Sequence, residues 1–305
     1  MLSHAYDYRS VLETSEKVNW KLEEVIAGGT LDFTRPFLPE SLARLKAIRC
    51  LSPEEKRTLN QIRGFTYLHL FGLVEEYIVP SVVDHVRHGV RGNGDERRAL
   101  LHFAEEEAKH IQLFQWFGEQ FQQGFGTPCG VIGPAEEIAA AILDHSPLGV
   151  FITTLHIEWM TQSHYLDSVK DNAKEKLDPL FCSMLKHHWL EESQHAKLDT
   201  LVVDRIASRL DRKEIEKGID DYMDIGKLLD GGLQTQVRMD VESLQTATGR
   251  VFTPVERGEI EREQLQSYRW TFLLSGMTHP NFDRSLRELS ADGHQRVGEL
   301  ARTIG

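Results

Sequence analysis

The stretch Lys186-His-His-Trp-Leu-Glu-Glu-Ser-Gln-His-Ala-Lys197 predicts a helix with a metal-binding face. Its residues His188, Glu192 and His195 are spaced by four and then three positions, which places all three side chains on one face of an α-helix. Glycine and proline are absent between positions 180 and 209, so nothing in the sequence interrupts the helix. Two imidazoles and a carboxylate on one face form a suitable ligand set for a transition metal.

Length and composition indicate a water-soluble globular protein. The chain has 305 residues, 40% of them hydrophobic, and a net charge of −12, which argues against a nucleic acid or an anionic membrane as partner. No stretch reaches the roughly 20 apolar residues of a membrane span, and the N-terminus lacks a signal pattern, so we expect a cytoplasmic protein. Cys50, Cys129 and Cys182 fit neither a disulfide framework nor a zinc site.

Helical patterns dominate the sequence, and strand signals are almost absent. Helix starts are predicted at Ser52-Pro53-Glu54-Glu55, Ser146-Pro147 and Asp178-Pro179, where a capping residue precedes a proline. Pro80 is expected to kink the helix that contains it. We predict one all-α domain over residues 1–305, with a four-helix core at about 52–210 and flanking helices in 1–51 and 211–305. The predicted helices cover about 8–26, 53–90, 95–123, 134–144, 147–169, 179–209, a long segment from 212, 254–274 and 282–301.

A second Glu-x-x-His pair, Glu107-Ala-Lys-His110, lies on the helix that follows a predicted turn at Gly89–Gly94. One such pair is close to chance, but its position is informative. The midpoint between Glu76 and Glu107 falls inside that turn, so two antiparallel helices would place these residues at the same height. Glu75 is the alternative, because neighbours on a helix point about 100° apart and only one of the two can face the core.

The pair Glu192-x-x-His195 has a matching partner in Glu158. The midpoint between Glu158 and Glu192 falls in the predicted loop Lys170–Lys176. Two helical hairpins would then each set one glutamate opposite one Glu-x-x-His pair. Packed together, they give the four-helix bundle and the ligand set of dimetal carboxylate proteins. The predicted ligands are Glu76, Glu107, His110, Glu158, Glu192 and His195.

Charge supports a metal at this position. Four carboxylates are costly to bury without compensation, and two divalent ions would neutralise them. Without metal, some of these carboxylates would have to bind protons to stay buried. The alternative is that the glutamates are solvated and the histidines satisfy hydrogen bonds in an ordinary core.

Other residues near the predicted ligands have more than one interpretation. Asp199 continues the helix face by one turn and either orients a ligand histidine or is an ordinary surface residue. His187 and His156 are expected to be capped or partly exposed. Phe103 and Phe114 share the face of the Glu107 pair and are expected to form core that keeps water away.

The spacing of these six residues resembles the ferritin-like di-iron carboxylate superfamily, over roughly residues 52–210. The run His188-x-x-x-Glu192-x-x-His195 is also similar to the extra-histidine motif of the para-aminobenzoate N-oxygenase family. That resemblance implies that His188 is a third imidazole ligand. The alternative is that His188 does not bind metal and either contacts a metal ligand or is simply buried.

The resemblance implies an oxygen-activating oxidoreductase in which these residues act through two iron ions, with manganese or a mixed Mn/Fe pair as alternatives. Its partners would be O₂, a small organic molecule such as an aryl amine, and an electron donor that the sequence does not identify. An exposed helical face is compatible with a homodimer. The competing hypotheses are an iron-binding or peroxide-detoxifying protein without organic substrate, and a binding protein.

Overall fold

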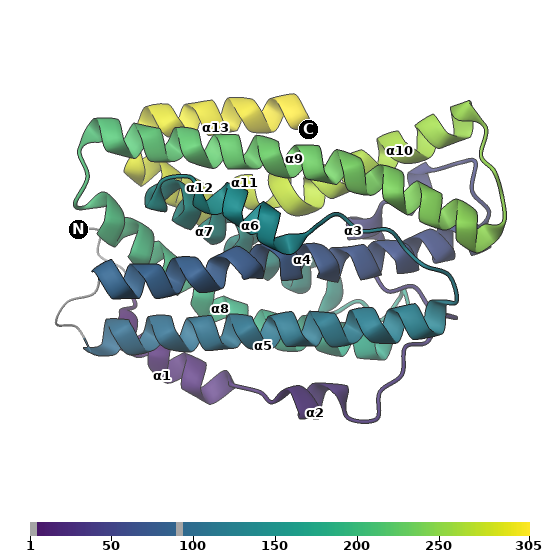
Figure 1. The fold of residues 1–305 in the computed structure, drawn as a ribbon, viewed down its shortest axis with the longest axis horizontal. Coiled ribbons are helices and arrows are strands. Elements are labelled where there is room, and N and C mark those ends of the chain that lie inside the picture. Colours follow the sequence, from purple (N-terminus) through teal and green to yellow (C-terminus); the bar gives the residue numbers. More distant parts are fainter. Residues whose placement is uncertain (1–4, 90–93) are drawn as a thin grey trace.

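The computed structural model describes residues 5–89 and 94–305, and these residues contain helices and no strand (Figure 1). The elements are α1 (Tyr8–Val18), α2 (Leu22–Ile26), α3 (Glu40–Ala43), η1 (Leu45–Ala47), α4 (Pro53–Gly89), α5 (Gly94–Phe125), α6 (Ala135–Leu143), α7 (Pro147–His164), η2 (Tyr165–Val169), α8 (Pro179–Ala207), α9 (Arg212–Thr248), α10 (Pro254–Arg269), η3 (Trp270–Leu274), α11 (Ser275–Met277), α12 (Pro280–Leu289) and α13 (Ala291–Ile304). Of these, η1 is a 3₁₀ turn, whereas η2 and η3 are π-helical.

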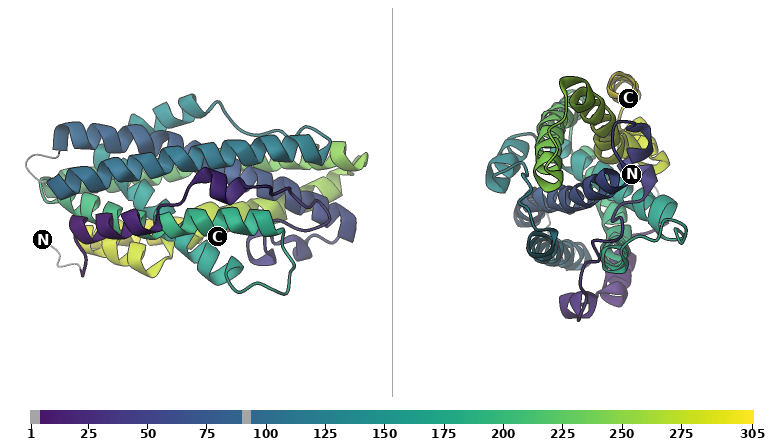
Figure 2. Two further views of the ribbon diagram at one scale, coloured as in Figure 1. Left: turned by 90° about the horizontal axis from the view of Figure 1, so that it is seen from below. Right: turned by 90° about the vertical axis from the view of Figure 1, so that its right-hand side faces the viewer.

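Four long helices, α4, α5, α7 and α8, pack into a bundle, and the two hairpins α4–α5 and α7–α8 are its halves. The prediction of an all-α, ferritin-like four-helix bundle with additional helices is therefore confirmed. Helices α1 and α2 lie along α5 and α8, whereas α9 and the C-terminal helices cover α4 and α7 on the opposite side (Figure 2). The two faces of the bundle are thus covered by different parts of the chain.

Local capping explains where the bundle helices begin. The Ser52 and Glu55 side chains bond each other's backbone N–H groups, at 3.2 and 2.7 Å, as a capping box requires. The Asp178 carboxylate accepts the Phe181 N–H at 2.7 Å, and Ser146 accepts the Gly149 N–H at 3.4 Å. Pro at the first turn of these helices has no N–H to satisfy, so it starts them without cost.

Some predicted boundaries are wrong. The helix expected over 8–26 is broken at residues 19–21, where Trp20 is buried under the bundle. Ser290 separates α12 from α13, where one helix was expected over 282–301. Most of the turn predicted at 89–94 lies outside the described residues.

Buried apolar side chains from the bundle and from the flanking helices belong to one contiguous core. The single domain over 1–305 stays a prediction. None of the helices in the described part of the chain is long and apolar enough to cross a membrane.

Candidate metal centre

Two adjoining groups of carboxylates and imidazoles lie in the centre of the bundle. Within each group, one ligand-type atom per residue lies within 4.8 Å of the others. Glu192 belongs to both groups, so one carboxylate links them. The first group is Glu75, His110, His188 and Glu192, and the second is Glu107, Glu158, Glu192 and His195.

The structure brings together every predicted site residue except Glu76. Glu75 is 2% exposed and lies in the first group, whereas Glu76 is half-buried and belongs to neither. The preference for Glu76 is therefore wrong. The midpoint argument fixes the height of a residue along the bundle, but a one-residue step turns the side chain by about 100° and so decides the face.

Separate alanine substitutions of Glu75 and Glu76 test which of the two residues binds metal. We expect Glu75→Ala to weaken metal binding at least about tenfold, because it removes a carboxylate from the centre. Glu76→Ala should retain the metal content of the unchanged protein, because its side chain points away. Metal titration of both variants measures the difference, and equal losses in the two would contradict the assignment.

The first group is tight and dry. The Nε2 atom of His188 lies 2.8 Å from Glu192 Oε1 and 3.3 Å from Glu75 Oε1. The Nδ1 atom of His110 lies 3.2 Å from Glu192 Oε1 and 3.6 Å from Glu75 Oε1. All four side chains are at most 3% exposed. His188 is thus placed with the predicted ligands rather than outside them.

The second group lies at the other carboxylate oxygen of Glu192, Oε2. His195 Nδ1 lies 3.1 Å from Glu107 Oε1, 3.4 Å from Glu192 Oε2 and 3.9 Å from Glu158 Oε2. Among the described residues, neither Glu107 oxygen makes a hydrogen bond, and the same holds for Glu158 Oε2 and His195 Nδ1. Buried polar atoms without partners are costly, and here they converge on one point. That is the arrangement expected of atoms that bind a cation.

Burial and mutual charge shift the titration of these groups strongly. Burial raises the pKa of Glu75 to about 8, and burial together with the neighbouring Glu192 raises the pKa of Glu158 well above its ordinary value. Burial acts to raise the pKa of Glu192 as well, but His188 and His195 outweigh it and lower that pKa well below the usual range. Without cations, the cluster would hold extra protons to balance its charge, and bound divalent ions would supply that balance instead.

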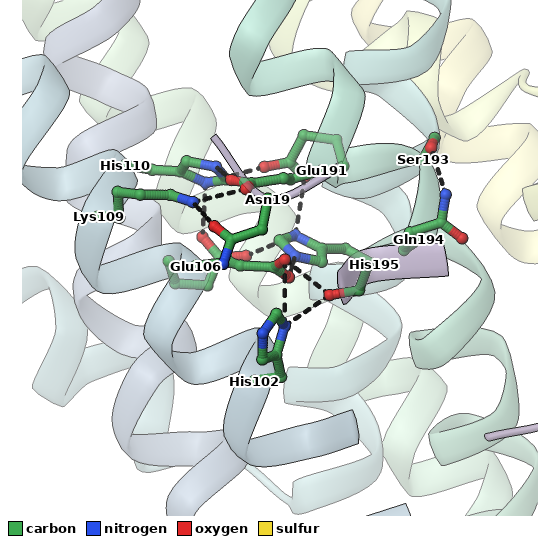
Figure 3. A network of polar contacts seen from close by, with 12 residues as sticks. Asn19, His102, Glu106, Lys109, His110, Glu191, Ser193, Gln194 and His195 are labelled. Carbon is green, nitrogen blue, oxygen red and sulfur yellow. Dashed lines mark hydrogen bonds and ion pairs between the residues drawn. The ribbon is translucent and has the colours of Figure 1, made fainter. Parts of the chain in front are cut away.

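A second layer of glutamates holds the two Glu-x-x-His histidines (Figure 3). His195 Nε2 lies 2.9 Å from Glu106 Oε2, and His110 Nε2 lies 2.9 Å from Glu191 Oε2. The contacts are crossed, because each histidine is held by a glutamate of the other helix. The Nδ1 atom of each ring is left facing the centre, as is usual when an outer carboxylate orients a metal-binding histidine.

Further contacts anchor this layer to the N-terminal segment. Lys109 Nζ donates to Glu191 Oε1 at 2.5 Å, to Asn19 Oδ1 at 2.9 Å and to the Trp20 carbonyl at 3.0 Å. The Trp20 indole stacks on the His110 ring, with 5.9 Å between centroids. The break between α1 and α2 therefore places a tryptophan over one histidine of the centre.

The other outer glutamate, Glu106, is held by residues on its side away from the centre. Ser15 Oγ donates to Glu106 Oε1 at 2.7 Å, and His102 Nδ1 lies 3.2 Å from the same oxygen. Burial acts to raise the pKa of Glu106, but its bonds with His102 and His195 outweigh burial and lower that pKa far below its usual range. Glu106 is therefore ionised and accepts hydrogen bonds throughout the neutral pH range.

Glu106 and Glu191 were missed by the sequence reasoning, although a signal was present. Both motifs read Glu-Glu-x-x-His, as Glu106-Glu107-x-x-His110 and Glu191-Glu192-x-x-His195. The sequence analysis predicts no role for the first glutamate of each doublet. The second glutamate of each doublet faces the centre, and the first contacts the histidine of the other helix, α5 or α8.

Asp199 does not orient a ligand histidine by hydrogen bonding. It is fully buried and neither of its oxygens has a hydrogen-bond partner among the described residues, while burial raises its pKa well above the usual value. His156 Nδ1 lies 2.7 Å from the Tyr222 hydroxyl, and His187 Nδ1 lies 2.7 Å from the Ser183 carbonyl. Neither histidine belongs to the two ligand groups. His156 is buried, contrary to the expected capped or partly exposed position.

The predicted aromatic core beside the centre is confirmed. The Phe103 ring lies 4.3 Å from the His195 ring, and the Phe114 ring lies 5.1 Å from the His188 ring. Both phenylalanines are buried. They limit the access of bulk water to the carboxylates.

Comparison with known proteins gives a family match over most of the chain. The family described as P-aminobenzoate N-oxygenase AurF matches residues 2–217. No curated protein sequence matches. Among solved structures, an R2-like ligand-binding oxidase with a Mn/Fe cofactor is similar at 15% identity, covering 87% of this chain and 92% of that chain, with a TM-score of 0.48. A variant of such an oxidase with a Fe/Fe cofactor is similar at 15% identity over 87% of this chain and 93% of its own, with a TM-score of 0.49.

Proposed function

This chain belongs to the p-aminobenzoate N-oxygenase family, and we propose that it is a dimetal oxygenase that uses O₂ to oxidise a small organic molecule. The aryl amine that names the family is the first candidate substrate class. The observation that carries the proposal is the pair of buried carboxylate–imidazole groups joined through Glu192.

The donor set fits two metal ions. Glu75, His110 and His188 would hold one ion, Glu107, Glu158 and His195 would hold the other, and Glu192 would contact both. The unpartnered oxygens and ring nitrogens that converge there support this assignment. Four carboxylates and neutral imidazoles balance two divalent ions, with iron as our proposal and manganese or a Mn/Fe pair as alternatives. Redox-active ions in this position would supply the electron transfer to O₂ that side chains alone cannot perform.

The chain's own residues would position and shield that chemistry. Glu106 and Glu191 accept the Nε2–H of the two histidines, which fixes each ring with Nδ1 toward the ions. Phe103, Phe114 and Trp20 cover the histidine side and exclude water. His188 gives the first group two imidazoles and the second group one, so the two ions would be inequivalent.

Transfer of one oxygen atom from O₂ to a substrate, with release of the other as water, consumes two further electrons. We therefore propose an external electron donor for this protein. A homodimer stays a prediction.

Product analysis tests the proposed function directly. The metal-loaded, chemically reduced protein is mixed with ¹⁸O₂ and a panel of aryl amines, and the products are examined by mass spectrometry. We expect an oxidised amine that carries the label, and no labelled product from Glu192→Ala. Iron mineral formation without any labelled product would contradict the proposal and favour an iron-storage role.

A further inference from the structure

An apolar cavity of about 420 Å³ lies between the bundle and its C-terminal covering. Helices α4 and α7 form its inner wall, and α9, η3, α6 and the segment before α6 form the rest. Its solvent-facing side lies on α9, where Lys227, Leu228, Gly231 and Thr235 line the cavity and are exposed. The volume lies within the range of about 300–1,000 Å³ typical of sites for small organic ligands.

The cavity borders the candidate metal centre on the side away from Trp20. Phe71 lines the cavity, and its ring lies 5.4 Å from the His188 ring. Val74 and Ile157 also line the cavity, and each directly precedes a residue of the candidate metal centre, Glu75 or Glu158. The same turns of α4 and α7 thus present carboxylates to the centre and apolar side chains to the cavity.

A π-helical turn contributes to the wall between cavity and centre. Phe272 of η3 lines the cavity, and its ring lies 5.6 Å from the Phe71 ring. The extra residue of a π-turn changes the direction of the side chains that follow, and such turns often lie at functional sites. A ligand in the cavity would therefore contact Phe272 and Phe71, and Phe71 in turn contacts His188.

None of the described residues that line the cavity is a buried group that could bind an anion by charge. Its lining is aliphatic, aromatic or glycine apart from Lys227 and Thr235. The Lys227 side chain is 64% exposed, and its Nζ donates to Asp224 Oδ1 at 2.8 Å. A carboxylate that entered the cavity would lose its hydration without gaining a fixed cation.

We propose that this cavity is the substrate site and that it takes an uncharged, predominantly apolar molecule rather than an aminoarene carboxylate such as p-aminobenzoate. This inference rests on the proposed function, because the centre beside the cavity is taken to be the oxidising site. The apolar body of the substrate fills the space between α4, α7 and α9, and its oxidisable group points toward Phe71 and His188.

The alkyl esters of p-aminobenzoate provide a matched probe, because they keep the ring and the amine and remove only the charge. Calorimetric titration of the metal-loaded protein should give binding of the ethyl ester on the order of a hundredfold tighter than that of the acid. From methyl to butyl ester, each added methylene should tighten binding about fourfold, as expected for burial in an apolar cavity. Equal or tighter binding of the acid would overturn the proposal.

Glycine substitutions on helices test whether binding occurs in this cavity. A Cβ at Gly232 would come 3.3 Å from Ile132 Cδ1 and so reduce the space, whereas Gly258 is exposed on α10 with nothing within 4 Å. Gly232→Leu should weaken binding of the butyl ester at least about tenfold, Gly232→Ala should weaken it less, and Gly258→Leu should leave it unchanged. Full binding by both folded Gly232 variants would overturn the assignment.

Binding and turnover separate this proposal from the proposed function. Ester binding that is lost in Gly232→Leu, without labelled product from any amine, would refute the oxygenase and leave the apolar ligand site. Labelled product from p-aminobenzoate with poor turnover of its esters would support the oxygenase and refute the uncharged substrate.

Discussion

Glu192→Ala should remove both metal ions, because Glu192 is the carboxylate shared by the two ligand groups. Loss of an outer-layer partner alone typically weakens metal binding about 10–100-fold, so loss of a shared ligand should exceed about a hundredfold. Elemental analysis should fall from about two ions per chain to nearly none. Oxygen-dependent product formation should fall with it.

Glu105→Ala is the matched control for this variant. Glu105 is exposed on α5, next to the outer glutamate Glu106, and it belongs to neither ligand group. It should keep both ions and full activity. If Glu192→Ala retained both ions, the assignment of Glu192 as the shared ligand would be wrong.

Removal of the metals with a chelator should lower the melting temperature by on the order of 10 °C. Ions present at about a thousand times their dissociation constant stabilise the native state by about 4 kcal/mol, and each kcal/mol corresponds to roughly 2–4 °C in a large domain. The physical reason is the buried charge, since Glu75, Glu107, Glu158 and Glu192 lose their counterions when the metal leaves. Calorimetry before and after dialysis against the chelator measures the shift.

The same treatment of Glu192→Ala supplies the control. That variant should already melt near the temperature of the chelated protein, and the chelator should change it little. If the wild-type protein still melted at its original temperature after chelator treatment, metal would not be what neutralises the buried carboxylates.

Helix periodicity, together with equal distances of paired residues from the turn between their helices, predicted most residues of the candidate metal centre. The two Glu-x-x-His pairs and Glu158 were found because antiparallel helices joined by short turns set residues at equal distances from the turn face to face. The same reasoning favoured Glu76 over Glu75, although height along a helix contains no information about its rotation. That rotation depends on how α4 packs, which only the assembled bundle determines.

Contacts between distant parts of the chain lay beyond the sequence reasoning. Trp20 reaches His110 only because α1 and α2 separate, and the sequence offered a continuous helix there. Phe272 reaches the cavity wall through a π-turn that has no glycine or proline to mark it. Such features depend on the surfaces against which a segment packs rather than on its own residue pattern.

The crossed bonds Glu106–His195 and Glu191–His110 also fix the sliding position of α5 against α8. The partners run in opposite sequence directions, so the helices are antiparallel at this point. A slide by one residue would move one helix about 1.5 Å along its axis and stretch both 2.9 Å contacts beyond good hydrogen-bond length. The two bonds therefore hold the register of α5 against α8, and a slide of these helices that shifts one histidine also displaces the other.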